Sequence, residues 1–302
     1  MSSSLNPIVE AYLEMLSEKS KPDIEFLEEK LITFGGAAYP KFGQVVIMAG
    51  GAGSGKGFVL NNLVGLEGKV FDVDELKQLA TRSPKIIQRV RDELGIDLTK
   101  LDTRKNELAL KDPNNVSLLH EIIGDALNIP DRKQQAFLAS VMTANPERKP
   151  NMIFDVTLKD FQKLNNITRM ANNLGYEKKN IHIVWVVNDV EVAISQNLSR
   201  DRTVPVEILV NTHRGVSATM MDIINMGDGL TRYMDGDIVF AFNQIKVDSD
   251  VTKSSRGGEY VKDANYFYVK RSGKGVTSLQ NLSKDVRQKI NSYVPPNVSW
   301  ID

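Results

Sequence analysis

The amino-acid sequence predicts an α/β protein with a mainly parallel sheet and helices on both faces. Four short segments are continuously apolar, which is typical of strands buried on both sides: residues 45–49, 69–73, 152–156 and 181–187. Helical patterns follow these segments, and strands that alternate with helices pair in parallel. Two more strands are expected over residues 237–242 and 266–270, before a final amphipathic helix over residues 279–293.

Local signals predict where several helices begin. Residues 58–64 are apolar enough to open a helix after the first strand, and a helix from residue 74 to about residue 80 is expected after the second. Thr157 begins a capping-box spacing behind the third strand, and Asn188 begins a similar one behind the fourth.

The composition excludes several classes of protein. The chain has 302 residues, of which 41% are hydrophobic and 25% charged, as in an ordinary globular protein. Lys plus Arg and Asp plus Glu number 38 each, so no overall charge directs the chain to nucleic acid or to a membrane surface. The absence of Cys excludes disulfides, thiolate metal sites and cysteine nucleophiles. The most apolar stretches are five to seven residues long, whereas a membrane helix needs about 20, so we expect a cytoplasmic protein.

Three regions are predicted along the chain. Residues 1–42 form an N-terminal helical segment, residues 43–245 the α/β domain, and residues 246–302 a C-terminal extension of strand, loop and helix. A helical insertion over about residues 81–150 separates the second and third strands, and its helices are interrupted by Pro84, Pro113, Pro130 and Pro146. We expect substrate specificity to reside in this insertion.

The strongest chemical signal is a glycine-rich loop directly after the first strand. It has the spacing G-x-x-x-x-G-K of a phosphate-binding loop and consists of Gly50, Gly51, Ala52, Gly53, Ser54, Gly55 and Lys56. Glycines let successive backbone N–H groups approach phosphate oxygens, and Lys56 adds a point charge at the terminal phosphates. The alternative is a glycine-rich turn without a ligand.

Gly57 completes the predicted cofactor-binding set but departs from the motif. That position normally holds Ser or Thr, whose hydroxyl ligates Mg²⁺, and glycine has no side chain to do so. Either carboxylates and water hold the metal, or the site binds nucleotide poorly and belongs to an inactive descendant of a kinase.

Three carboxylates follow predicted strands, where the ligands of doubly wound sheets lie. Asp72 and Asp74 come at the end of the second strand, and Asp74 is a candidate general base for phosphoryl transfer, although it could also be a helix N-cap. Asp155 ends the third strand in the Walker B pattern of a Mg²⁺ or water-positioning site.

Arginines and histidines complete the list of candidates. Arg200, Arg202 and Arg214 follow the fourth strand and are suited to spreading charge over a phosphoryl group, whereas the alternative is a solvated helix face. The three histidines lack metal-ligand spacing, and a structural role is expected for His182.

In this order, the four elements resemble the zeta-toxin-type kinases, a P-loop family related to phage polynucleotide kinases and chloramphenicol phosphotransferases. The resemblance covers residues 45–216 and implies a P-loop kinase-like fold with Asp74 at the base position. Residues 155–159 are similar to the family's acid-Gly-Thr-Leu-Arg segment, with Val156 and Lys159 as departures. The resemblance also implies two lid arginines, Arg200 and Arg214, and a substrate-binding set of Asp72, Thr157 and Lys159.

The implied activity is ATP-dependent phosphorylation of a hydroxyl, with ATP and Mg²⁺ as cofactors. The acceptor would be a small molecule such as a UDP-activated sugar. Two alternatives stay open: a 5′-polynucleotide kinase, which the balanced charge disfavours, and an inactive P-loop protein with a binding or structural role. A protein partner is compatible with each of them, and a membrane is not expected.

Overall fold

The computed structural model describes residues 32–37, 40–72, 81–106, 108–122, 145–200, 203–244, 251–253, 259–261 and 263–276. The helix predicted over residues 74–80, the final helix over residues 279–293 and residues 1–31 of the predicted N-terminal helical segment lie outside these ranges. The described residues 32–37 of that segment form β-bridges and a turn, not a helix. None of the described helices is long and apolar enough to cross a membrane.

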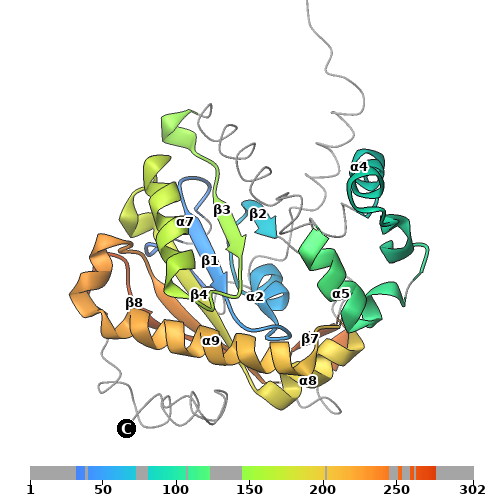
Figure 1. Ribbon diagram of the computed structural model, residues 1–302. Coiled ribbons are helices and arrows are strands. Elements are labelled where there is room, and N and C mark those ends of the chain that lie inside the picture. Colours follow the sequence, from blue (N-terminus) through green and yellow to red (C-terminus); the bar gives the residue numbers. More distant parts are fainter. Residues whose placement is uncertain are drawn as a thin grey trace, which may run out of the picture.

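A six-stranded sheet forms the centre of the molecule, in the order β2-β3-β1-β4-β5-β8 (Figure 1). Neighbouring strands are parallel except at the edge, where β8 runs antiparallel to β5. The strands are β1 (Val45–Ala49), β2 (Lys69–Asp72), β3 (Met152–Asp155), β4 (Ile181–Asn188), β5 (Ile238–Gln244) and β8 (Asp263–Lys270). This arrangement confirms the predicted P-loop kinase-like α/β fold.

The four strands predicted from continuous apolar runs all occur, and each predicted boundary is within one residue of the observed one. Of the two later strands, β5 runs on to Gln244, beyond the predicted end at residue 242, and β8 begins at Asp263, before the predicted start at residue 266. Between them lies a small hairpin of β6 (Val251–Lys253) and β7 (Glu259–Val261).

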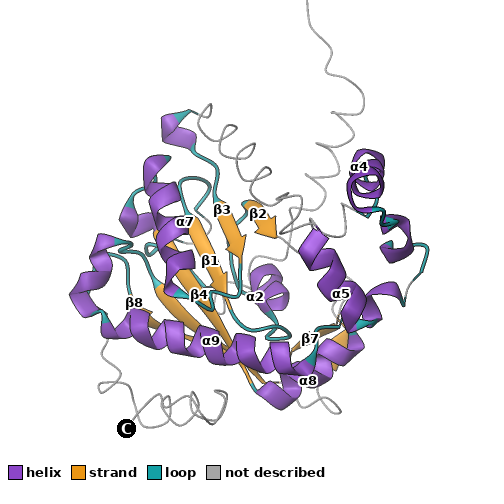
Figure 2. Ribbon diagram, in the orientation of Figure 1, coloured by secondary structure: helices purple, strands orange, loops and turns teal. Residues whose placement is uncertain are grey.

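Helices cover both faces of the sheet (Figure 2). On one face the apolar sides of α7 (Phe161–Asn173) and α9 (Val206–Asn225) pack against alternate strand residues such as Ile47. On the other face α2 (Lys56–Asn62) and residues 32–34 pack against the intervening residues such as Met48. The central strands β1 and β3 are apolar up to their ends because both of their faces are buried, whereas the edge strand β2 exposes Lys69 and Val70.

The starts of two helices differ from the prediction. Thr157 does not cap a helix: α7 begins at Phe161, and the carboxylate of Asp160 accepts a hydrogen bond from the Lys163 N–H at 2.8 Å. Helix α8 (Val190–Ser199) is capped by Asp189, one residue after the predicted position, through the Glu191 N–H at 2.8 Å. A short acidic side chain next to the first turn supplies the missing acceptor in both cases.

The described part of the insertion has a small core of its own. Helices α4 (Pro84–Leu94) and α5 (Pro113–His120) enclose buried aliphatic residues, namely Val90, Leu98, Leu101, Leu110, Val116, Leu119 and Ile122. Pro84 and Pro113 do not interrupt helices as predicted, because each stands at the first position of one, where its missing N–H costs nothing.

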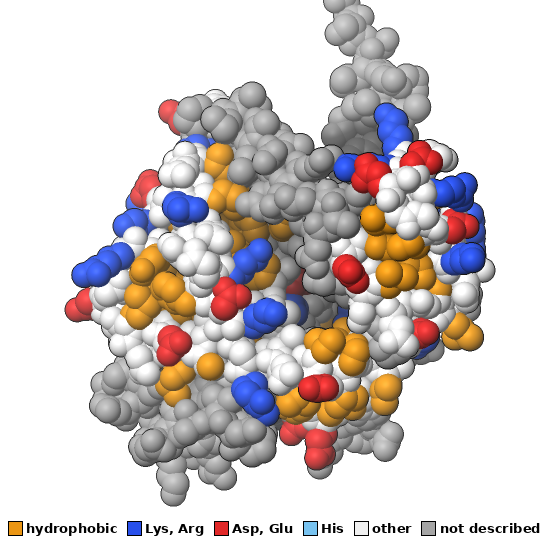
Figure 3. All heavy atoms as spheres, viewed as in Figure 1, with side chains coloured by type: hydrophobic (Ala, Val, Ile, Leu, Met, Phe, Trp, Pro, Cys, Tyr) orange, Lys and Arg blue, Asp and Glu red, His pale blue; other side chains and the backbone are white. Residues whose placement is uncertain are grey.

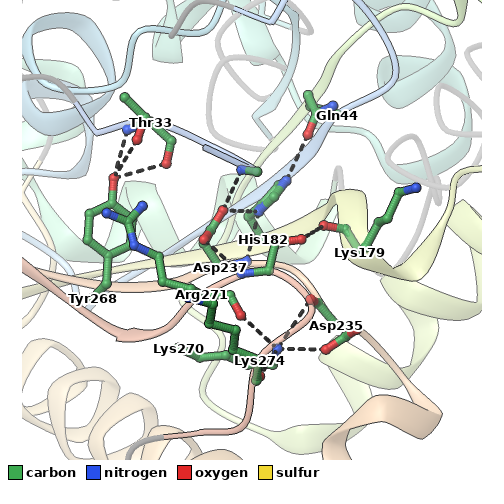
Figure 4. Close-up of polar contacts among 12 residues, drawn as sticks. Thr33, Gln44, Lys179, His182, Asp235, Asp237, Tyr268, Lys270, Arg271 and Lys274 are labelled. Atoms are coloured by element: carbon green, nitrogen blue, oxygen red, sulfur yellow. Dashed lines mark hydrogen bonds and ion pairs between the residues drawn. The ribbon is translucent and has the colours of Figure 1, made fainter. Parts of the chain in front are cut away.

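A buried network of hydrogen bonds joins the amino-terminal ends of β4 and β5 (Figure 4). The carboxylate of Asp237 accepts hydrogen bonds from the N–H groups of Gly35 and Ser272 at 2.7 and 3.0 Å and lies 3.1 Å from Nδ1 of His182. Nε2 of His182 lies 2.8 Å from Oε1 of Gln44. Burial lowers the pKa of His182, so the ring is neutral and structural, in agreement with its predicted role.

Candidate phosphate-binding site

The glycine-rich loop joins β1 to α2 at the carboxyl edge of the sheet. Strand register aligns Asp155 at the end of β3 with Met48 on one side and with Asp72 at the end of β2 on the other. The backbone positions of Asp72 and Asp155 therefore share one edge of the sheet with the loop, where ligands of such sheets bind. The side chain of Asp72 and the whole of Asp74 lie outside the described part of the chain.

The carbonyl groups of the loop are bonded within the protein. Nζ of Lys56 donates to the Gly50 carbonyl at 2.9 Å and to the Gly51 carbonyl at 3.4 Å. The Ala52 carbonyl lies 2.8 Å from Nε2 of a histidine on α9, and the Gly53 carbonyl accepts from a β4 asparagine at 3.2 Å.

The N–H groups of the loop are left open to a ligand. In the described part of the chain, no hydrogen bond uses the N–H of Gly53, Gly55, Lys56 or Gly57. Gly55 has a left-handed backbone with φ of 89°, and α2 starts directly after it. Consecutive open N–H groups at a helix start form an anion site, to which the positive end of the helix dipole contributes.

Two glycines of the loop are required by close contacts. A Cβ on Gly51 would lie 2.5 Å from Cγ and 2.6 Å from Nε2 of His213. A Cβ on Gly53, whose φ is +73°, would lie 2.5 Å from the carbonyl oxygen of Ala193 in α8. The loop is thus packed tightly between α8 and α9, and side chains at these two positions would push it away from them.

Lys56 and Asp155 meet at the site, as the motifs predict. Nζ of Lys56 lies 3.8 Å from Oδ1 of Asp155, and the two side chains are 15% and 21% exposed. A lysine beside a partly exposed carboxylate can serve a phosphate on one side and a bound cation on the other.

The donor set for a metal ion is small. No group of three or more His, Cys, Asp or Glu side chains comes together among the described residues, and Asp155 is the described carboxylate at the loop. A Cβ on Gly57 would meet no heavy atom of the described residues within 4 Å, so none of these residues fills the space where the missing side chain would begin. One carboxylate fits Mg²⁺ when phosphate oxygens and water complete the coordination, as is usual for this ion.

Strand β3 is followed by a strained turn beside the loop. Leu158 has a φ of 53°, which is unusual for a bulky residue, and its side chain is buried in the core under α7. The preceding residue, Thr157, accepts the Gly50 N–H at 3.4 Å through its carbonyl. Lys159, predicted to bind substrate, is exposed, and its backbone lies close to Gly215 of α9.

The predicted arginines differ in their surroundings. Nε of Arg214 is buried and has no hydrogen-bond partner in the part of the chain that the structure describes. Arg200 is exposed at the carboxyl end of α8, and Arg202 lies outside the described residues. An unpartnered guanidinium nitrogen next to the loop-binding part of α9 is a candidate contact for an anion.

The insertion is bonded to the segment between α8 and α9. Thr203 donates its N–H to the Leu110 carbonyl at 3.0 Å and its hydroxyl to the Lys111 carbonyl at 2.6 Å, and Lys111 Nζ reaches the Leu198 carbonyl at 3.3 Å. Figure 3 shows that this face of the molecule is hollowed between the side that bears α7 and the side that bears α5, with charged side chains around the hollow.

Sequence reasoning missed three residues that shape the loop. The capping-box spacing predicts a helix cap at Asn188, which instead donates to the Gly53 carbonyl, and for His213 the sequence indicates only that metal-ligand spacing is absent. Thr212, whose hydroxyl accepts the Ala52 N–H at 3.0 Å, carries no signal in the sequence.

Comparison with known proteins gives similarity at the level of structure only. No family model and no curated protein matches the sequence. The solved complex AvrRxo1-ORF1:AvrRxo1-ORF2 with sulphate ions is 12% identical, with a TM-score of 0.43 over 86% of this chain and 66% of that one. The same complex with ATP is 12% identical, with a TM-score of 0.42 over 86% and 65%.

A third solved structure belongs to the PezAT chromosomal toxin–antitoxin system of Streptococcus pneumoniae. It is 12% identical, with a TM-score of 0.34 over 69% of this chain and 70% of that one. The chain spans slightly less than two thirds of the AvrRxo1 chains that it matches. At these identities and TM-scores the similarity does not extend to activity.

Proposed function

We propose that this chain is an ATP-dependent kinase that phosphorylates a hydroxyl group of a small molecule. The observation that carries the proposal is the orientation of the backbone groups in the glycine-rich loop. Its carbonyls from Gly50 to Gly53 accept hydrogen bonds from within the protein. The N–H groups of Gly53, Gly55, Lys56 and Gly57 have no acceptor among the described residues. Such a loop at the start of a helix is suited to the phosphates of a nucleotide.

Charged groups and backbone N–H groups around the loop would carry the transfer. Lys56 and the loop N–H groups hold the β- and γ-phosphates, and Arg200 and Arg214 neutralise charge on the transferring group. The acceptor oxygen bonds to the γ-phosphorus as the bond to the β–γ bridging oxygen breaks, ADP leaves, and the hydroxyl proton passes to Asp74. Mg²⁺, when bound, supplies positive charge at the phosphates, and Asp155 would hold it.

The acceptor in this proposal is a small molecule such as a UDP-activated sugar, contacted by Asp72, Thr157 and Lys159. This follows from the resemblance to the zeta-toxin-type kinases and from the balanced charge of 38 basic and 38 acidic residues, which does not favour a nucleic-acid strand. The cytoplasmic location remains a prediction, as does the involvement of a protein partner.

A second candidate function is nucleotide binding without phosphoryl transfer. It is favoured by Gly57, because the hydroxyl that normally ligates Mg²⁺ at this position is missing. A kinase with a weakened metal site and a nucleotide-binding protein without turnover would have the same loop. Only a measurement of phosphoryl transfer distinguishes these two functions.

The test is transfer from γ-labelled ATP to a panel of UDP-sugars and 5′-hydroxyl oligonucleotides in the presence of Mg²⁺. Wild type should label at least one sugar nucleotide, and Lys56→Ala and Asp74→Ala should each lose that activity by 100-fold or more, an order-of-magnitude expectation for groups at the reacting phosphate. Lys163→Ala, which removes an exposed lysine of α7 outside the insertion, is the matched control. Labelling of oligonucleotides alone would show that the acceptor is a nucleic acid and not a small molecule. ATP binding without any transfer would support nucleotide binding as the function.

A further inference from the structure

Helix α9 holds the glycine-rich loop through two consecutive side chains. The hydroxyl of Thr212 accepts the Ala52 N–H at 3.0 Å and donates to the Leu209 carbonyl at 2.7 Å. Nε2 of His213 lies 2.8 Å from the carbonyl oxygen of the same Ala52. Both polar backbone groups of one loop residue are therefore fixed by α9, which lies more than 100 residues away in the sequence.

His213 is itself firmly held. It is 4% exposed, and its ring lies against Gly51 so closely that no side chain fits there. Burial lowers the pKa of His213, the charge of Lys56 lowers it further, and the ring is therefore neutral near pH 7. Because a carbonyl can only accept, the ring must carry its proton on Nε2.

The geometry of the peptide group gives this contact a consequence for the ligand. The carbonyl of Ala52 and the N–H of Gly53 belong to one trans peptide, in which the two groups point in opposite directions. A donor that fixes the Ala52 carbonyl toward α9 therefore turns the Gly53 N–H to the other side of the loop. That N–H is one of the groups that take no acceptor among the described residues.

We propose that His213 is a positioning residue for the phosphate loop, which orients the Gly53 N–H toward the bound nucleotide by hydrogen bonding to the Ala52 carbonyl. The inference rests on the proposed function for the identity of the ligand. Arg214 follows His213 directly on α9, so the same contact fixes the loop relative to the helix that carries this arginine.

The choice of variants separates the hydrogen bond from the bulk of the ring. His213→Phe keeps an aromatic ring but removes the donor. His213→Gln keeps an amide N–H at a reach close to that of Nε2, and His213→Asn keeps the amide on a side chain that is one carbon shorter. His182→Gln is the control: it changes the other described buried histidine, at the opposite edge of the sheet.

The experiment is calorimetric titration with ATP, below the melting temperature of each variant. We expect His213→Phe and His213→Asn to bind ATP about tenfold or more weakly, His213→Gln to bind within about threefold of wild type, and His182→Gln to bind as wild type does. If His213→Phe does not fold, the comparison of the Gln and Asn variants decides. Equal affinity for ATP in wild type and the Asn variant would overturn the proposal, as would a Gln variant no better than Asn.

A second measurement distinguishes failure of this inference from failure of the proposed function. If wild type does not bind ATP, the proposed function fails, but the nucleotide-free protein still reports on the loop. The ¹⁵N chemical shifts of the His213 ring should show a neutral ring with the proton on Nε2, and the Gly53 amide should exchange faster than the Ala52 amide. A ring protonated on Nδ1 alone would contradict the positioning role.

Discussion

Replacing Gly51 with alanine should place a methyl group against the buried ring of His213. The added carbon would lie 2.5 Å from Cγ and 2.6 Å from Nε2 of the ring, whereas carbon atoms in ordinary contact are about 3.5–4.0 Å apart. The ring is 4% exposed and hydrogen bonded to Ala52, so it cannot move aside without losing that bond. Overpacking costs about 1–3 kcal/mol, and the lost hydrogen bond adds about 1 kcal/mol, which gives about 2–4 kcal/mol in the free energy of unfolding.

The assay is thermal unfolding followed by circular dichroism, together with ATP titration. A loss of about 2–4 kcal/mol corresponds to a fall in Tm of about 5–10 °C for a domain of this size. Gly57→Ala is the matched control, because its methyl group would meet no heavy atom of the described residues within 4 Å and alanine favours the helix by up to about 1 kcal/mol. A Gly51→Ala protein with the Tm and the ATP affinity of wild type would refute the packing of α9 against the loop.

Three further predictions concern the metal site, the buried histidines and the insertion. Gly57→Ser should lower the Mg²⁺ concentration that gives half-maximal ATP binding by about tenfold, because the new hydroxyl adds a ligand in open space, and an unchanged Mg²⁺ titration would count against a metal at this position. The free energy of unfolding should fall as the pH drops below about 6.5, because His182 and His213 have lowered pKa values in the folded state and take up protons on unfolding. Each histidine contributes a slope of up to about 1.4 kcal/mol per pH unit, so denaturant titrations of His182→Gln should give a flatter profile, and an equal slope would exclude its contribution. Thr203→Val, which removes the bond to the Lys111 carbonyl, should lower the free energy of unfolding by about 1 kcal/mol, and an unchanged Tm would show that this contact does not hold the insertion.

The central strands and the loop could be predicted because their signals are local. A strand buried on both faces has to be apolar at every position, and the observed boundaries fall within one residue of the predicted ones at β1 to β4. The glycine-rich spacing likewise predicts Lys56 at the start of α2, and the Walker B pattern predicts Asp155 at the end of β3, where the two side chains meet. Each of these features depends on a run of neighbouring residues.

The contacts that shape the loop could not be predicted in this way. His213 and Thr212 reach it from a helix more than 100 residues further along the chain, and nothing in the sequence near Gly51 indicates which side chain will lie against it. The positive φ of Leu158 is another example, because a bulky residue adopts it only when tertiary packing holds it there. The predicted starts of α7 and α8 are wrong for a related reason. Several residues near each start could act as the N-cap, and the path of the preceding turn decides which of them does.

The most direct test of the phosphate site is calorimetric titration of ATP with and without Mg²⁺, on wild type and on Lys56→Ala. Nζ of Lys56 donates to the Gly50 and Gly51 carbonyls and lies 3.8 Å from Asp155, so its removal should abolish ATP binding without unfolding the protein. The site as described predicts ATP binding by wild type that is strengthened by Mg²⁺ and lost in the variant. Absence of binding in wild type, or equal binding by the folded variant, would contradict a nucleotide site at this loop.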